Sequence, residues 1–285
     1  MRLGLSTFVY QAAGAPVAEG LSRIRDFGFE FVDYTAYESW DPTSMARSGV
    51  RELVRMFSDL GLRPSQVLLV SVRDLASASA DLRQQTMDYM KGCGEFQLSL
   101  GGKQVLICSG CGSHETATMR EQTWVHCVNG IQAYADWCAD KGLLVELEMS
   151  PHVYTIVNDF MKTVKMIEDV DRPNVFANVD IGHLSLTREG PKALDKLASK
   201  ILHVHLSETE GFAHTSKIIG TGAVDYGPYL ERAEGLGLER NCAEHGVTAV
   251  AGVEMGEPGT QVDDPDHWVR QSLVYIERTL PGLQM

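Results

Sequence analysis

Four apolar segments in the second half of the chain end in residues that can bind a metal ion. The segments are 143–148, 175–180, 201–205 and 250–254, and their last residues are Glu148, Asp180, His205 and Glu254. A charged or imidazole side chain at the end of a buried segment is unfavourable unless another group compensates it. If the four segments are strands of one closed sheet, these side chains lie together, and a divalent cation is the simplest compensation. The pattern therefore predicts a metal site.

The donor atoms indicate which cation this site would hold. Carboxylates favour hard cations, and the single imidazole also admits softer ones. We therefore expect one divalent cation, with Mn²⁺ first and Mg²⁺ or Co²⁺ as alternatives. Zn²⁺ is a less favoured alternative, because the predicted set contains neither a second histidine nor a cysteine.

Two of the segments offer a second ligand candidate. Glu146 and His203 lie two residues before Glu148 and His205, so each pair faces the same side of its strand. We choose Glu148 and His205 because they are nearer to the strand end. His203 then becomes a candidate hydrogen-bond partner behind the metal ligand.

Each of the four candidates also has an ordinary structural explanation when it is taken singly. A carboxylate at a strand end is often a helix cap or half of an ion pair, and a histidine in an apolar strand is often a core residue. Glu257 competes with Glu254 for the last position, although we expect it in the following loop. The convergence of four such residues favours a metal site over four unrelated accidents.

A regular alternation of strands and helices is expected to hold these side chains. The predicted strands are 2–7, 31–35, 65–72, 104–109, 143–148, 175–180, 201–205 and 247–255; the predicted helices are 16–27, 48–60, 80–100, 118–141, 158–170, 191–197, 226–235 and 265–280. Eight such units within 285 residues predict an α/β protein with the (β/α)₈ TIM-barrel fold. No linker or low-complexity tract divides the chain, so residues 1–285 are expected to form a single domain.

Composition limits the partners of the protein. The formal net charge of -13 disfavours nucleic acid and anionic membranes, which both require a basic face. No apolar run approaches the roughly 20 residues that span a bilayer, which predicts a soluble, cytoplasmic protein. The scattered cysteines indicate reduced thiols. Cys108 and Cys111 form a C-x-x-C pair, for which we favour a structural or cavity-wall role over metal or redox chemistry.

These motifs resemble the xylose isomerase-like TIM-barrel superfamily, of the sugar phosphate isomerase/epimerase type. The resemblance covers nearly the whole chain and is most specific at Leu147-Glu148, Asp180-Ile181-Gly182-His183, 203–208, 220–225 and Val253-Glu254. It implies that Glu148, Asp180, His205 and Glu254 are the metal ligands and that His183 contacts the substrate. It also implies a homodimer or homotetramer, with a hetero-oligomer as the alternative.

The chain departs from two groups of that superfamily. Ketose 3-epimerases carry a substrate-binding glutamate where this chain has Tyr154, and an arginine where it has Gly211. A free ketohexose is therefore a less favoured substrate. Endonuclease IV carries additional ligands for three zinc ions, but His214 here follows Phe212-Ala213 and does not belong to an Asp-x-His pair. We therefore do not expect a trinuclear site.

The predicted site suits proton transfer next to a carbonyl group. A cation acting as a Lewis acid would stabilise an enediolate. Glu148 and Glu254 come from strands on either side of the metal and could act as base and acid. The first hypothesis is accordingly a metal-dependent isomerase or epimerase of a carbohydrate, a small-molecule sugar or keto-sugar, with Glu148, Glu254 and His183 as catalytic residues.

The same chemistry could instead eliminate a β substituent. The second hypothesis is a lyase that acts on an inosose or a 3-keto-glycoside, including a C-glycoside. Elimination requires a further acid, and the candidates are His152, His183 and Lys217, although His152 and Lys217 could equally be solvated loop residues. Aromatic walls for the sugar, or core packing instead, are expected of Tyr37, Trp40 and Phe212. A non-catalytic barrel and a nucleic-acid phosphodiesterase are the remaining, disfavoured hypotheses.

Overall fold

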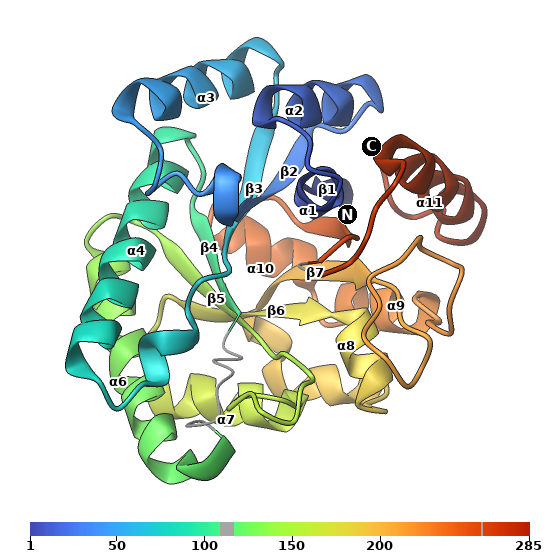
Figure 1. The fold of residues 1–285 in the computed structure, drawn as a ribbon. Coiled ribbons are helices and arrows are strands. Elements are labelled where there is room, and N and C mark those ends of the chain that lie inside the picture. The colour runs from blue at the N-terminus through green and yellow to red at the C-terminus, as the bar shows by residue number, and fades with distance from the viewer. Residues whose placement is uncertain (109–116, 258) are drawn as a thin grey trace.

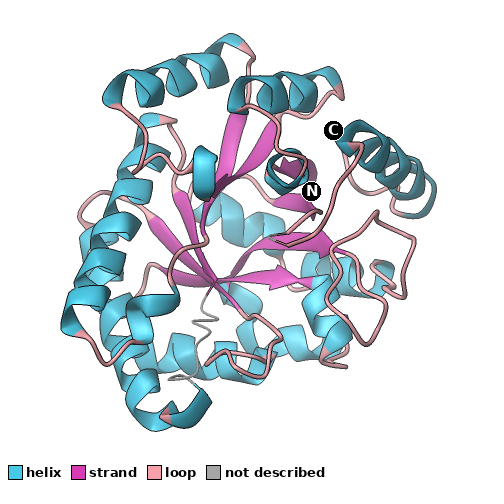
Figure 2. Cartoon of the chain, in the orientation of Figure 1, coloured by secondary structure: helices cyan, strands magenta, loops and turns pink. Residues whose placement is uncertain are grey.

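Eight parallel strands close into a barrel in the computed structural model of the protein, which describes residues 1–108, 117–257 and 259–285. Each strand pairs with the next in the sequence, and the last pairs with the first, which confirms the predicted TIM barrel (Figures 1 and 2). The strands are β1 (Arg2–Ser6), β2 (Phe31–Ala36), β3 (Arg63–Leu69), β4 (Gln104–Cys108), β5 (Leu144–Glu148), β6 (Val175–Asp180), β7 (Ile201–Ser207) and β8 (Val250–Glu254).

Helices surround this barrel and cover the outer faces of the strands (Figure 2). The α-helices are α1 (Phe8–Ala12), α2 (Val17–Asp26), α3 (Arg47–Asp59), α4 (Ala80–Ser99), α6 (Arg120–Ala139), α7 (Phe160–Val170), α8 (Ile181–Leu186), α9 (Gly227–Gly235), α10 (Leu238–Glu244) and α11 (Pro265–Thr279). Three 3₁₀ segments complete the described elements: η1 (Glu38–Trp40), η2 (Arg73–Ala76) and η3 (Pro191–Lys200). The core lies between the outer faces of the strands and the buried faces of the helices.

The structure corrects the sequence prediction in the shorter elements. The predicted helix at 191–197 is the 3₁₀ segment η3, which extends to Lys200 and changes direction at Leu197. The prediction also omitted α1, α8 and α10. These helices have five to seven residues, and so short a helix shows less than two turns of the hydrophobic periodicity on which such a prediction depends.

The inside of the barrel is polar over much of its length. Asp33 of β2 is in register with Gln66 of β3, which is in register with Gln104 of β4. On the other side, Asn178 of β6 is in register with His203 of β7. All of these side chains are buried, so their polar atoms must find partners within the barrel.

Gly252 of β8 leaves room for this polar interior. A Cβ atom at this position would overlap the carboxylate of Asp33 and would lie 3.1 Å from Nε2 of His203. The absence of a side chain at Gly252 therefore allows Asp33 of β2 and His203 of β7 to meet across the barrel.

No helix among the described residues is both long and apolar enough to cross a membrane.

Candidate metal centre

Four predicted ligands meet at the carboxyl-terminal end of the barrel. Glu148 ends β5, Asp180 ends β6, His205 lies two residues before the end of β7, and Glu254 ends β8. One ligand atom from each of them lies within 4.8 Å of the other three. The strand register explains the convergence. Asp180 of β6 pairs with His205 of β7, and Ser207, two residues further along β7, pairs with Glu254 of β8. None of the four is more than 4% exposed.

A carboxylate oxygen of this cluster that accepts no hydrogen bond fits a bound cation. Oδ1 of Asp180 accepts hydrogen bonds from the backbone N–H of His183 at 2.8 Å and from the hydroxyl of Ser207 at 2.6 Å. Oδ2 of Asp180 is buried without a hydrogen-bond partner among the described residues. Such an oxygen is unfavourable unless a cation or a donor meets it. The three carboxylates and one imidazole would hold Mn²⁺, Mg²⁺, Co²⁺ or Zn²⁺.

Burial and mutual repulsion shape the charges of the cluster. His205 Nδ1 lies 2.9 Å from Glu148 Oε1 and 2.8 Å from Glu254 Oε2. Burial raises the pKa of Glu254 to about 8, with the charge of Glu148 adding to the effect and that of His205 opposing it. Burial alone would lower the pKa of His205, but the Glu254 and Glu148 carboxylates hold it well above its ordinary value. Without a cation, protons must therefore balance the carboxylates.

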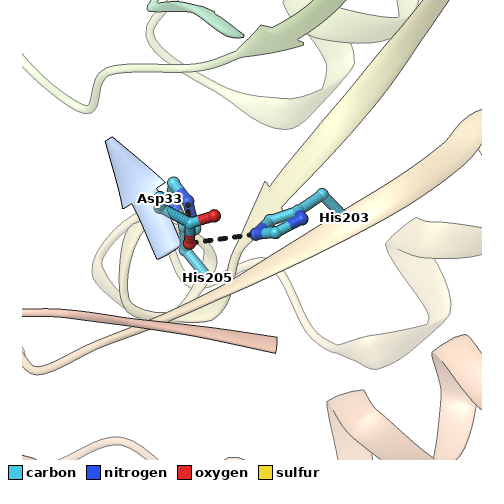
Figure 3. Close-up of side chains that lie close together, drawn as sticks. All are labelled: Asp33, His203 and His205. Carbon is cyan, nitrogen blue, oxygen red and sulfur yellow. Dashed lines mark hydrogen bonds and ion pairs between the residues drawn. The ribbon is translucent and has the colours of Figure 1, made fainter. Parts of the chain in front are cut away.

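A further set of side chains orients His205 from inside the barrel. Oδ2 of Asp33 lies 3.2 Å from Nε2 of His203 and 3.6 Å from Nε2 of His205, and Figure 3 shows the carboxylate beside both rings. Burial would raise the pKa of Asp33, but the charges and hydrogen bonds of the two histidines outweigh it and hold that pKa well below its ordinary value. Asp33 therefore remains charged behind the ligand, and His203 is a partner of that carboxylate.

The amide of Gln66 fixes which nitrogen of His205 faces the cluster. One end of the amide lies 2.6 Å from Nε2 of His205, while its Oε1 is buried without a partner among the described residues. Rotation about the last bond of the Gln66 side chain exchanges the oxygen and nitrogen ends of its amide. With Oε1 toward the ring, Nε2–H of His205 donates to Gln66, and the Nδ1 lone pair is left for a cation.

Glu146 and Asn178 complete the surroundings of the centre. Glu146 lies deeper than Glu148 and accepts a hydrogen bond from Gln104 Nε2 at 3.2 Å. Burial raises the pKa of Glu146 to about 8. The side-chain amide of Asn178 donates to Glu148 Oε1 and lies 3.0 Å from His205 Nδ1. Glu146 is therefore outside the four-residue cluster, in which Glu148 takes the position at the strand end.

A cavity of about 230 Å³ opens above the cluster. Its two sides differ in chemistry. Apolar side chains line one side: Phe8, Leu68, Leu69, Val70, Val72 and Leu106. Ionisable side chains line the other: Glu148, His152, His183, His214, Glu254 and Glu257. Cys108 also contributes to the wall, whereas Cys111 lies outside the described residues.

The structure brings two of the four predicted substrate-binding residues to this cavity. His183 lines it with Nδ1 2.9 Å from the Met149 carbonyl oxygen, and His152 lines it with its ring stacked on Tyr154. Lys217 is exposed and pairs with Glu210 at 2.6 Å.

Trp40 also lies away from the cavity. It is 1% exposed, packs in the core against Gly20, and donates its indole N–H to the Ala15 carbonyl. For Trp40 the structure favours the core-packing alternative over a sugar-binding wall.

The loop after β7 folds around a buried carboxylate for which no role was predicted from the sequence. Glu208 is 1% exposed. Its oxygens accept hydrogen bonds from the backbone N–H groups of Thr209, Gly220 and Val224 and from the hydroxyl of Tyr226. A Cβ atom on Gly222 would overlap this carboxylate and the Thr209 carbonyl oxygen. Glu208 therefore fixes the conformation of the 220–225 motif from within, and the same loop carries His214, which bridges to Thr209 and lines the cavity.

Comparison with known proteins identifies a family whose model matches most of the chain and one distant relative. The family described as xylose isomerase-like TIM barrel matches residues 21–243. An L-ribulose 3-epimerase of Methylomonas sp. (strain DH-1) is 24% identical over 230 residues, which are 78% of this chain and 74% of that protein.

Solved structures share the fold over the whole chain. A crystal structure of IOLI protein with a binding zinc atom superposes with a TM-score of 0.80 at 18% identity and covers 100% of both chains. The D-psicose 3-epimerase from Clostridium cellulolyticum H10, solved with D-tagatose, superposes with a TM-score of 0.79 at 15% identity over 98% of this chain and 99% of that chain.

Proposed function

Because the chain belongs to the xylose isomerase-like TIM-barrel family, we propose that it is a divalent-metal-dependent isomerase or epimerase of a sugar or keto-sugar. The convergence of Glu148, Asp180, His205 and Glu254 at the end of a cavity carries this proposal. Proteins similar to this chain include ketose 3-epimerases, one of which was solved with a ketose. Mn²⁺ is the proposed native metal, although the relative solved with zinc keeps Zn²⁺ as an alternative.

The proposed proton transfer assigns different tasks to the metal ligands and to His183. A divalent cation held by the four residues would act as a Lewis acid toward a carbonyl group and its neighbouring hydroxyl. Glu148 and Glu254 approach His205 Nδ1 from β5 and β8, the two outer strands of the four that supply ligands. One carboxylate would remove the proton next to the carbonyl group, and the other would return a proton to the opposite face. His183 would hold a substrate oxygen at the cavity wall.

A lyase is the second candidate, and the apolar side of the cavity favours it. A free ketose carries hydroxyl groups along its whole length, and burying them against Phe8, Leu68 and Leu106 would leave them without partners. A keto-sugar with an apolar substituent would fit both sides. Tyr154, where ketose 3-epimerases carry a glutamate, also lines this cavity.

Incubation in ²H₂O with Mn²⁺ would separate the two candidates. The substrates are D-tagatose, L-ribulose and a 3-keto-glucoside with an aromatic aglycone. Deuterium next to the carbonyl group together with a new epimer supports the isomerase, and an enone with released aglycone supports the lyase. Glu254→Gln is the matched inactive variant. Absence of both exchange and product with the wild-type protein and Mn²⁺ would refute the proposal.

The state of the protein in solution is a separate part of the proposal. We propose a homodimer or homotetramer, with a hetero-oligomer as the alternative, in the cytoplasm and without a nucleic-acid or membrane partner. Sedimentation analysis of the purified protein tests the oligomer, and a monomer at micromolar concentration would contradict it.

A further inference from the structure

A second cavity, which we call the amino-terminal cavity, lies at the end of the barrel opposite the metal centre. Its volume is about 300 Å³. The first residues of four strands line it: Phe31 of β2, Arg63 of β3, Gln104 of β4 and Val250 of β8. Because β3 has seven residues, its two ends are about 20 Å apart at about 3.3 Å per residue. A molecule bound in the amino-terminal cavity would therefore be too far from the metal centre to be its substrate.

The ionisable side chains that line the amino-terminal cavity within the described ranges are both cationic. They are Arg63 and Lys103. Nη1 of Arg63 lies 3.2 Å from Oε1 of Glu30, and the guanidinium packs over the ring of Phe31 at 4.8 Å. Glu30 also pairs with Arg2 through its other oxygen at 3.1 Å, so one carboxylate faces two arginines. The surroundings of the cavity therefore carry excess positive charge, in a protein whose formal net charge is -13.

Hydrogen-bond donors at this cavity are left for a ligand. In the part of the chain that the structure describes, neither the ammonium group of Lys103 nor the hydroxyl of Thr248 has a hydrogen-bond or ion-pair partner. A Cβ atom at Gly246 would lie 2.9 Å from Nζ of Lys103, which places the ammonium group against the turn before β8. The guanidinium of Arg63 has five N–H groups and donates to Glu30 through Nη1. Ammonium, hydroxyl and guanidinium donors thus reach one cavity from three separate parts of the chain.

Two other polar side chains of the lining are paired toward the inside of the barrel. The hydroxyl of Ser65 donates to Oδ1 of Asp33. The side-chain amide of Gln104 donates to Oε1 of Glu146 at 3.2 Å. Both carboxylates are buried inside the barrel, and neither lines the amino-terminal cavity. The two cations of the lining therefore determine which charge a ligand of this cavity can carry, and that charge is negative.

A phosphate group matches these donors in charge and in hydrogen bonding. It carries close to two negative charges at neutral pH and has strong acceptor oxygens, and arginine can bind two of them at once. We propose that the amino-terminal cavity binds a phosphate dianion, free or as part of a small phosphorylated molecule, through Arg63, Lys103 and Thr248. Leu62 and Leu100 on the wall would cover the organic part of such a molecule. This site goes beyond the proposed function and does not depend on the substrate of the metal centre.

Calorimetric titration of the full chain in the presence of Mg²⁺ tests the site. The titrants are inorganic phosphate, glycerol 3-phosphate and, as the uncharged control, glycerol. We expect saturable binding of both phosphates, weakened by added salt because charged groups make the contacts, and no binding of glycerol. Tighter binding of glycerol 3-phosphate would identify a small phosphorylated molecule as the ligand, and tighter binding of inorganic phosphate would identify the free ion. Absence of saturable binding of either phosphate at millimolar concentrations would overturn the proposal.

Variants of the lining locate the bound anion. Lys103→Ala should weaken phosphate binding by about 10-fold or more, the effect of losing a hydrogen bond to a charged group. Thr248→Val, which keeps the shape of the side chain, should weaken it by about 5-fold. The matched control is Lys196→Ala, because Lys196 is an exposed lysine of η3 that does not line the cavity, and this variant should bind phosphate as the wild-type protein does. Wild-type affinity in both Lys103→Ala and Thr248→Val would place the phosphate elsewhere, the metal centre included, and would overturn the proposal.

Discussion

Asp180 has two separable tasks, and substitution can distinguish them. Its Oδ1 caps α8 through the backbone N–H of His183 and accepts the Ser207 hydroxyl, whereas its Oδ2 has no hydrogen-bond partner among the described residues. Asparagine keeps an oxygen at the Oδ1 position but replaces Oδ2 with an NH₂ group. Alanine removes both. Asp180→Asn should therefore strongly weaken metal binding with little damage to the fold, whereas Asp180→Ala should weaken metal binding and also destabilise the fold.

The expected magnitudes follow from these contacts. Loss of one outer partner of a metal ligand typically reduces metal affinity 10- to 100-fold, so loss of a ligand itself should reduce it by at least about 100-fold in both variants. Both variants also remove one negative charge from a crowded cluster. Their difference in stability then isolates the cap, worth about 1 kcal/mol, and the stranded Ser207 hydroxyl, worth about 1 kcal/mol or more. Asp180→Ala should accordingly be about 2 kcal/mol less stable than Asp180→Asn.

Calorimetric titration with Mn²⁺ and urea unfolding of the metal-free proteins measure the two effects separately. Asp264 supplies the matched control, because it caps α11 by accepting from the backbone N–H of His267 at 2.9 Å and lies outside the metal cluster. Asp264→Ala should lose about 1 kcal/mol of stability and keep the wild-type metal affinity. Wild-type affinity in Asp180→Asn would refute the assignment of Asp180 as a ligand. Equal stability of the two Asp180 variants would refute the capping argument.

Three further predictions concern the surroundings of the centre. Asp33→Asn should reduce Mn²⁺ affinity by about 10- to 100-fold in a titration, since it removes the charge behind His205, and unchanged affinity would contradict that role. Gly252→Ala should lower the free energy of unfolding by about 3 kcal/mol or more through overlap with Asp33, whereas Gly190→Ala, which meets no heavy atom within 4 Å, should have little effect. Glu257→Gln should destabilise the protein most between about pH 4.5 and 6.5, the ordinary pKa values of a glutamate and a histidine. The lowered pKa of Glu257 contributes stability that is lost as pH falls toward about 2. The raised pKa of His214 contributes stability that is lost as pH rises toward about 9. Urea unfolding across this range that shows a constant difference would contradict the ion pair between Glu257 and His214.

Strand ends were the most predictable part of the molecule. A buried parallel strand is apolar along its length, so a carboxylate or imidazole at its last residue stands out in the sequence, as Glu148 and Asp180 do. The carboxyl ends of the strands in a barrel meet at one face. These two facts were sufficient to predict a cluster that the structure assembles from four strands.

The polar interior was less predictable because it depends on which face of a strand points inward. Asp33 and Gln66 are also polar residues within apolar runs, and that pattern could have marked them. However, their partners His203 and His205 approach from across the barrel. Such a contact depends on the register of strands that are far apart in the sequence, which the periodicity of a single strand does not contain.

Loop residues were least predictable, and they carry most of what distinguishes this cavity. The ligands on β5 to β8 would serve many carbonyl substrates, whereas Tyr154 and His214 belong to the loops after β5 and β7. His214 lines the cavity from the loop after β7, and in that loop the buried carboxylate of Glu208 binds the backbone N–H groups of Thr209 and Gly220, which lie before and after His214 in the sequence. Substrate selectivity is therefore expected to depend on these loops. The loop after β7 is held by the buried Glu208 through the backbone N–H groups of Thr209, Gly220 and Val224.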